Sequence, residues 1–163
     1  MTNRNTMRLA LASVVLALAS FASPSYADDG YLVFSTAALH FKNQDERRAL
    51  VPGVGWEYSP TKKLGFHVGT LSDSFGFQAT YAGINYGTPR FWNNKARFLI
   101  GATIIHKQFH KNTSAEAKIV PFPVLEIALA KNAVLNISGS PKIDYAGSHS
   151  NGVMFFQVKF NLR

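Results

Sequence analysis

The chain contains no cysteine, which excludes disulfide bonds and thiolate metal sites. Acidic residues are also scarce: nine Asp and Glu stand against 17 Lys and Arg, giving a formal net charge of +8. No convincing helical period appears in the region that follows the first apolar segment. What remains are short segments rich in Val, Ile, Phe, Tyr and Thr, so stability has to come from the packing or the closure of β-strands.

Residues 1–27 have the pattern of a cleavable signal peptide. Arg4 and Arg8 precede an apolar run over residues 9–21, and a small-x-small motif ends at Ala27. The run is shorter than the roughly 20 apolar residues that a membrane-spanning helix needs. We therefore expect export and cleavage after Ala27, with a retained membrane anchor as the alternative.

Residues 28–163 would then be the mature protein, which has the length of one domain. Its charge falls from +8 to +6, because the leader contains two arginines and no acidic residue. A basic chain can bind nucleic acid, but an exported chain meets the phosphates of anionic lipids and lipopolysaccharide instead. The charge favours a membrane surface as partner and no nucleic acid.

The last strand alternates with period two. Met154, Phe156 and Val158 fall on one face, while Gln157 and Lys159 fall on the other. Seven further segments have strand composition, bounded by Gly, Pro, Asn or Lys. The eight predicted strands cover residues 31–41, 51–58, 64–71, 75–87, 96–109, 119–129, 134–140 and 153–162. Eight is an even number, as in bacterial membrane barrels.

The connections alternate between long polar loops (42–50, 110–118 and 141–152) and short turns (59–63 and 130–133). Long outer loops and short periplasmic turns are typical of outer-membrane barrels. The sequence thus predicts an all-β fold, an eight-stranded antiparallel transmembrane β-barrel of the outer membrane, as a single domain. Both ends of the barrel domain would face the periplasm.

The lumen of so small a barrel holds side chains or one narrow ligand. Val153 and Phe155 point inward near the outer end, where they either line an acyl-chain pocket or simply fill the barrel. Pro121, Pro123 and Pro141 flank the sixth and seventh strands, and proline cannot donate to a strand ladder. They predict either an interrupted seam that admits a lipid tail or ordinary strand ends.

Four segments resemble the lipid A palmitoyltransferase (PagP) family. They are Pro121-Phe122-Pro123-Val124-Leu125, Ser140-Pro141 with Asn151-Gly152-Val153, Leu71-Ser72-Asp73-Ser74-Phe75, and Ala38-Leu39-His40-Phe41. The resemblance implies an enzyme that moves a palmitoyl or similar chain from a glycerophospholipid to lipid A at the outer leaflet. It implies a catalytic group of His40, Asp73 and Ser74, without a metal or other cofactor.

The chemistry suits these residue types. Acyl transfer needs a base for the incoming hydroxyl and donors for the oxyanion, and histidine titrates near neutrality with a pKa of about 6.5. Ser74 would be nucleophile or polarising donor, and Asp73 would orient His40 or stabilise its charged form. Without the resemblance, a rim histidine and an Asp-Ser turn are ordinary polar surface.

This chain departs from the family in three ways. Too few residues separate the cleavage site from His40 for a sizeable N-terminal periplasmic helix. Ser35 stands where the family has a proline in the first strand, although Pro52 remains beyond the first loop. The family's glycine at the floor of the acyl pocket corresponds to Asn85, although a shift of one strand register would place Gly83 or Gly87 near the floor instead.

Arg47 and Arg48 are the best candidates for contact with lipid A phosphates, since arginine binds phosphate bidentately. Two other functions stay open for this monomeric barrel: a lipid A deacylase or other barrel lipase, and a non-enzymatic structural or adhesive barrel. The deacylase motif separates its histidine and serine by one residue, whereas His149 and Ser150 are adjacent here.

Overall fold

The computed structural model describes residues 29–41, 47–109, 113–140, 143–145, 148–150 and 152–162. The predicted signal peptide and Pro141 lie outside these residues and stay predictions. Every regular element in the described part is a strand. No helix there is long and apolar enough to cross a membrane.

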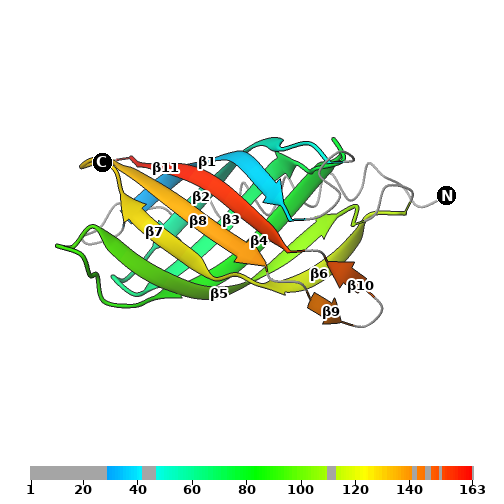
Figure 1. The fold of residues 1–163 in the computed structure, drawn as a ribbon. Coiled ribbons are helices and arrows are strands. Elements are labelled where there is room, and N and C mark those ends of the chain that lie inside the picture. Colours follow the sequence, from blue (N-terminus) through cyan, green and yellow to red (C-terminus); the bar gives the residue numbers. More distant parts are fainter. Residues whose placement is uncertain are drawn as a thin grey trace.

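The strands form a closed antiparallel barrel, which confirms the predicted fold class (Figure 1). Its elements are β1 (Asp29–His40), β2 (Leu50–Ser59), β3 (Leu64–Ser72), β4 (Gln78–Gly87), β5 (Ala96–Lys107), β6 (Glu116–Pro121), β7 (Val124–Ala128), β8 (Ala133–Ser140) and β11 (Val153–Asn161). A separate hairpin of β9 (Ile143–Tyr145) and β10 (Ser148–Ser150) lies in the last long loop.

Closure comes from two pairings. β1 pairs with β11, which joins the two ends of the chain, and β4 pairs with β5. Both β6 and β7 pair with β5, so they are two halves of one strand and the wall has eight strands. A closed wall leaves no unpaired edge along its circumference except where a strand is interrupted.

Two differences from the predicted strands have a clear physical cause. The fourth strand begins at Gln78 and not at residue 75, because Asp73 binds the backbone of the residues that follow it and holds them in a turn. The sixth strand is broken between Pro121 and Pro123, and this break is the interruption that the prolines predicted.

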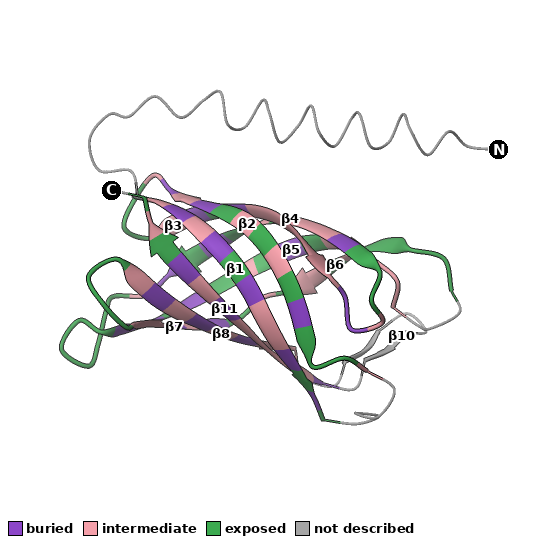
Figure 2. Ribbon diagram, turned by 90° about the horizontal axis from the view of Figure 1, so that it is seen from above, coloured by how far each residue is buried: buried purple, intermediate pink, exposed green. Residues whose placement is uncertain are grey.

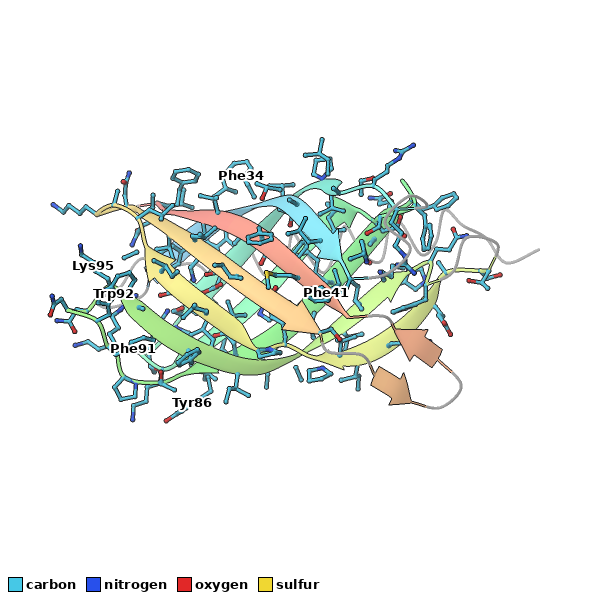
Figure 3. The ribbon with its side chains drawn as sticks, in the orientation of Figure 1. Phe34, Phe41, Tyr86, Phe91, Trp92 and Lys95 are labelled. Atoms are coloured by element: carbon cyan, nitrogen blue, oxygen red, sulfur yellow. The ribbon has the colours of Figure 1, made fainter. Side chains whose placement is uncertain are left out.

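Side chains alternate between a polar lumen and an apolar outer surface (Figure 2). We call the end of the barrel at His40 the upper rim, and the end where β1 begins and β11 finishes the lower rim. Exposed aromatic side chains mark both: Phe41 and Phe77 at the upper rim, and Tyr86, Phe91 and Trp92 at the lower rim, where Figure 3 labels them together. The outer surface between the rims is an apolar belt, with these large exposed side chains: Phe34, Val54, Trp56, Phe66, Ile84, Phe98, Ile100, Ile104 and Phe160.

The lower lumen is filled by a charged cluster of five residues. Lys159 is fully buried, and its Nζ lies 2.6 Å from Glu57 Oε1 and 2.7 Å from Glu126 Oε2. Arg97 binds Glu126 through Nε at 2.7 Å and through Nη2 at 2.9 Å, and Arg90 adds a contact of 2.7 Å. Two carboxylates and three cations thus pair within the lower lumen, with one positive charge in excess.

Candidate active site

The upper rim brings His40 and Ser74 together. His40 is the last residue of β1, and Ser74 lies in the turn between β3 and β4. His40 Nε2 lies 2.6 Å from Ser74 Oγ, and both residues are buried. An imidazole nitrogen at this distance can accept the hydroxyl proton, which is the geometry that activates a serine or an alcohol bound beside it.

Asp73 fixes the turn that presents Ser74. Its Oδ1 accepts hydrogen bonds from the backbone N–H groups of Phe75 and Phe77, each at 2.9 Å. Its own N–H donates to the carbonyl of Phe77 at 2.7 Å, and Gly76 has a φ of +88°, which favours glycine. The backbone N–H of Arg48 donates to the carbonyl of Ser74 at 2.8 Å. The turn is therefore tied both to itself and to the segment before β2.

The carboxylate of Asp73 has a second oxygen with a different environment. Oδ2 is buried, since Asp73 is only 2% exposed, and it has no hydrogen-bond partner among the described residues. A buried acceptor without a partner is uncommon in proteins. Oδ1 stabilises the turn, whereas Oδ2 makes no hydrogen bond to the described residues.

Cations surround the pair. Arg47 stacks its guanidinium 4.9 Å from the centre of the Phe75 ring. Burial, together with the charges of Arg47 and Lys107, lowers the pKa of His40 to about 4. His40 lies level with Phe41 and beyond the apolar belt. Burial also lowers the pKa of Lys107, the last residue of β5, while the charge of Asp73 opposes the shift. His40 is neutral at pH 7 and available as a base.

The lumen below the pair is apolar. Ala38, Val51 and Ala79 are buried there, and Val153 lies opposite His40 in the register of β1 and β11. Val153 and Phe155 stand on the same face of β11 as the buried Gln157 and Lys159, so both point inward as predicted. The side chains that line the upper lumen are therefore mostly small or apolar.

Tyr81 and His67 form a layer across the middle of the lumen. The Tyr81 side chain runs from β4 over Gly69 and Gly55, where a Cβ atom at either glycine would collide with its hydroxyl. The hydroxyl reaches the side chains of Ser35 and Gln157 on the far strands, which are themselves 3.2 Å apart.

His67 belongs to the same layer, and its side chain reaches toward β5. Its Nε2 lies 2.9 Å from Thr103 Oγ1, and its ring is 5.7 Å from that of Phe122 and 6.1 Å from that of Tyr81. The layer separates the apolar upper lumen from the charged cluster below.

Gly83, Asn85 and Gly87 all lie on the inner face of β4, as the alternation of burial along the strand requires. The side chain of Asn85 is buried, and its Nδ2 lies 3.5 Å from His67 Nδ1. Because β4 descends from the upper rim, Tyr81 lies nearer to Ser74 than Asn85 does. A chain entering from the rim meets Tyr81 first.

A lateral cleft of about 500 Å³ opens beside the proline break. Among the described residues β6 pairs only with β5, and the pairing of β7 with β8 ends at Val124 and Ser138. Pro123, Gly139 and Val153 are among its lining residues, so the cleft contains both inward and outward positions of the wall. Pro121 and Pro123 thus stand at a gap in the seam.

Pro52 lies in a second hollow, of about 460 Å³, between β2 and β3. It borders Gly76 in the turn that carries Ser74. Arg48, the other predicted phosphate ligand, is exposed, and its guanidinium packs against Gly76. No group of three or more potential metal ligands occurs in the described part of the chain.

Sequence reasoning missed Tyr81 and His67. The period-two phase of β3 and β4 placed their side chains on the inner face, which is the signal that was available. Their partners lie on strands that are distant in sequence, and no local pattern reveals those contacts.

Comparisons with known proteins give a likeness of structure only. No family model and no curated protein matches the chain. A solved structure of the Yersinia pestis outer membrane protein Ail, in a phospholipid bilayer nanodisc, is similar at 10% sequence identity and a TM-score of 0.44. The match covers 83% of this chain and 100% of that one.

Proposed function

We propose that this protein is an outer-membrane enzyme that moves an acyl chain from a glycerophospholipid to lipid A. The observation that carries the proposal is the 2.6 Å contact between His40 Nε2 and Ser74 Oγ, above an apolar lumen and near a lateral cleft. Ester chemistry needs a base beside a hydroxyl, and a lipid substrate needs an apolar path to that base.

The location is supported by the outer surface. The apolar belt lies between two sets of aromatic side chains, as expected for a barrel surrounded by lipid, and the closed wall satisfies its backbone hydrogen bonds internally. The strand segments between the rims would cross the bilayer, and the protein would be a monomer. His40 and Ser74 would face the outer leaflet, where lipid A lies.

In the proposed reaction the donor's acyl chain enters the upper lumen through the cleft at Pro123. His40 takes the proton of the attacking hydroxyl, which belongs to Ser74 or to lipid A, as the new ester bond forms. The bond to the glycerol oxygen breaks, and that oxygen receives the proton, which leaves a lysophospholipid. If Ser74 is the attacking group, a lipid A hydroxyl then gives its proton to His40 and attacks the acyl-serine ester, and the proton returns to Ser74 Oγ as that ester bond breaks. Lys107, Arg47 and Arg48 lie where they can stabilise the oxyanion and the lipid phosphates.

A non-enzymatic barrel is the second candidate. The layer of Tyr81 and His67 and the charged cluster below it fill the middle and lower lumen, as a purely structural barrel would require. A hydrolase is the third candidate, because His40 and Ser74 could equally transfer the acyl group to water.

Purified protein in mixed micelles of a phospholipid and lipid A separates the three functions. Acyl transfer yields a lysophospholipid together with lipid A that is heavier by one acyl chain. Hydrolysis yields free fatty acid, and a structural barrel leaves both lipids unchanged. Wild-type protein and protein with Ser74→Ala form the matched pair.

The low pKa of His40 predicts an unusual pH profile. A base with a pKa of about 4 is neutral above that value, so activity should stay level from pH 7 to about pH 5 and fall only as the pH drops through about 4. Arg47→Gln removes one cation that depresses the pKa and should move this acid limb upward. Initial rates across pH test both statements, and an acid limb near 6.5 in the wild type would contradict them.

Tyr81 is expected to limit the length of the accepted acyl chain. Tyr81→Ala removes the side chain that crosses the lumen and should shift the preference toward longer chains, by about tenfold for each methylene accommodated. Tyr81→Phe keeps the ring and loses only the contacts of the hydroxyl, so its preference should stay that of the wild type. Competition between phospholipids of different chain length measures the shift, and equal preferences in all three proteins would remove Tyr81 from this role.

A further inference from the structure

The turn between β4 and β5 at the lower rim has a strained backbone. Trp92, Asn93 and Asn94 have φ values of 52°, 53° and 63°, three successive residues in the left-handed region. Asparagine tolerates this region, but tryptophan rarely occupies it. Backbone strain of this kind often accompanies a functional requirement. Here it accompanies a Trp92 side chain that is 66% exposed.

Further aromatic side chains gather around Trp92. Tyr86 and Phe91 are also exposed, and Figure 3 labels both at the same end of the barrel as Trp92. The ring of Phe91 stacks on that of Phe98 at 5.2 Å, with an angle of 25° between the planes. Amphipathic rings at one end of an apolar belt are suited to the level of lipid headgroups. The aromatic group therefore extends from the belt to the rim.

Three lysines border the same group. The carbonyl of Lys63 accepts a hydrogen bond of 2.6 Å from Gly87, which places Lys63 beside Tyr86. The carbonyl of Lys95 accepts one of 2.7 Å from Ala128, which places Lys95 near the turn that carries Lys131.

All three lysines are exposed, and within the described residues none has an ion pair. The turns between β2 and β3, β4 and β5, and β7 and β8 contain no Asp or Glu. Asp29 begins β1 at the same rim, but the three turns themselves contain only positive charge, next to the exposed aromatic rings.

We propose that Lys63, Tyr86, Phe91, Trp92, Lys95 and Lys131, the lower-rim patch, form a binding surface for the phosphate headgroups of anionic phospholipids. The rings enter the interface of the facing leaflet, and the three ammonium groups meet the phosphates. One cation near an anionic surface strengthens binding about fivefold, so three of them distinguish an anionic lipid from a zwitterionic one. The proposal rests on the proposed insertion into a membrane and not on acyl transfer.

The two tryptophans of the chain supply a matched test. Trp56→Phe leaves Trp92 as the single fluorophore in the patch, and Trp92→Phe leaves Trp56, which lies on the outer surface of β2 within the belt. Each protein is folded into vesicles that contain brominated phosphatidylglycerol or brominated phosphatidylcholine, which quench a neighbouring tryptophan.

We expect phosphatidylglycerol to associate at Trp92 about fivefold or more strongly than phosphatidylcholine in low salt. Replacing Lys63, Lys95 and Lys131 together by Gln should abolish this preference. Quenching of Trp56 should show no preference for either lipid. Equal quenching of Trp92 by both lipids, or the same preference at Trp56, would overturn the proposal. Absence of quenching at both tryptophans would instead overturn the membrane location, and this proposal with it.

Discussion

His40→Ala is expected to reduce acyl transfer by about 10²- to 10⁴-fold while the barrel folds as in the wild type. The side chain ends β1 at the rim, where its Nε2 contacts Ser74 Oγ at 2.6 Å, and it lies away from the charged cluster of the lower lumen. Initial rates of lysophospholipid release measure the loss. The heat-modifiable mobility of the barrel on a gel verifies that it is folded.

Two variants at Asp73 show how that residue acts. Asn at position 73 keeps an oxygen that accepts from the N–H groups of Phe75 and Phe77, so Asp73→Asn should preserve the turn. Asp73→Ala loses both bonds and should lower activity further than Asp73→Asn does. If the two variants are equally inactive and both folded, the charge of Asp73 matters more than the turn.

Wild-type activity in His40→Ala would remove His40 from the mechanism.

Lys159→Met is expected to destabilise the barrel by about 3–5 kcal/mol, because it leaves the buried carboxylates of Glu57 and Glu126 without their shared cation. Glu126 keeps its ion pair with Arg97, but Glu57 loses its ion pair with Lys159. Urea unfolding in vesicles, followed by tryptophan fluorescence, measures the change in free energy. This is the largest stability effect that we expect from one substitution.

A double variant separates unpaired charge from lost packing. Adding Glu57→Gln to Lys159→Met removes the carboxylate that is left without a partner, so much of the stability should return. A control at the pair of Glu116 and Lys118, where Glu116 is exposed, is Glu116→Gln, which should change the free energy by about 1 kcal/mol or less. A Lys159→Met barrel with the unfolding midpoint of the wild type would show that the cluster contributes no stability.

The barrel itself could be predicted because the two faces of a strand have different surroundings, so the polarity of its side chains alternates with period two. Phe156, Val158 and Phe160 alternate with Gln157 and Lys159, and that pattern needs no knowledge of neighbouring strands. The break at Pro121 and Pro123 was also predictable, since proline lacks the N–H that a ladder requires. The start of β4 was not, because the carboxylate of Asp73 accepts from the backbone N–H groups of Phe75 and Phe77 and holds this segment in a turn.

The candidate site was predictable only in part. A family resemblance selected His40 and Ser74, and the structure brings their polar atoms together from positions 34 residues apart. The Tyr81 layer depends on contacts with Gly55 and Gly69 across two other strands, and the charged cluster depends on register between β2, β7 and β11. Such contacts follow from closure and are invisible in any local segment.

The most direct test of the proposed function is the mass spectrum of lipid A from cells that produce this protein, compared with cells that produce the His40→Ala protein. The account predicts a lipid A species heavier by one fatty acyl group with the wild type alone, and the added mass gives the chain length. An unchanged spectrum from correctly inserted wild-type barrels, or a species that has lost a chain, would contradict acyl transfer to lipid A.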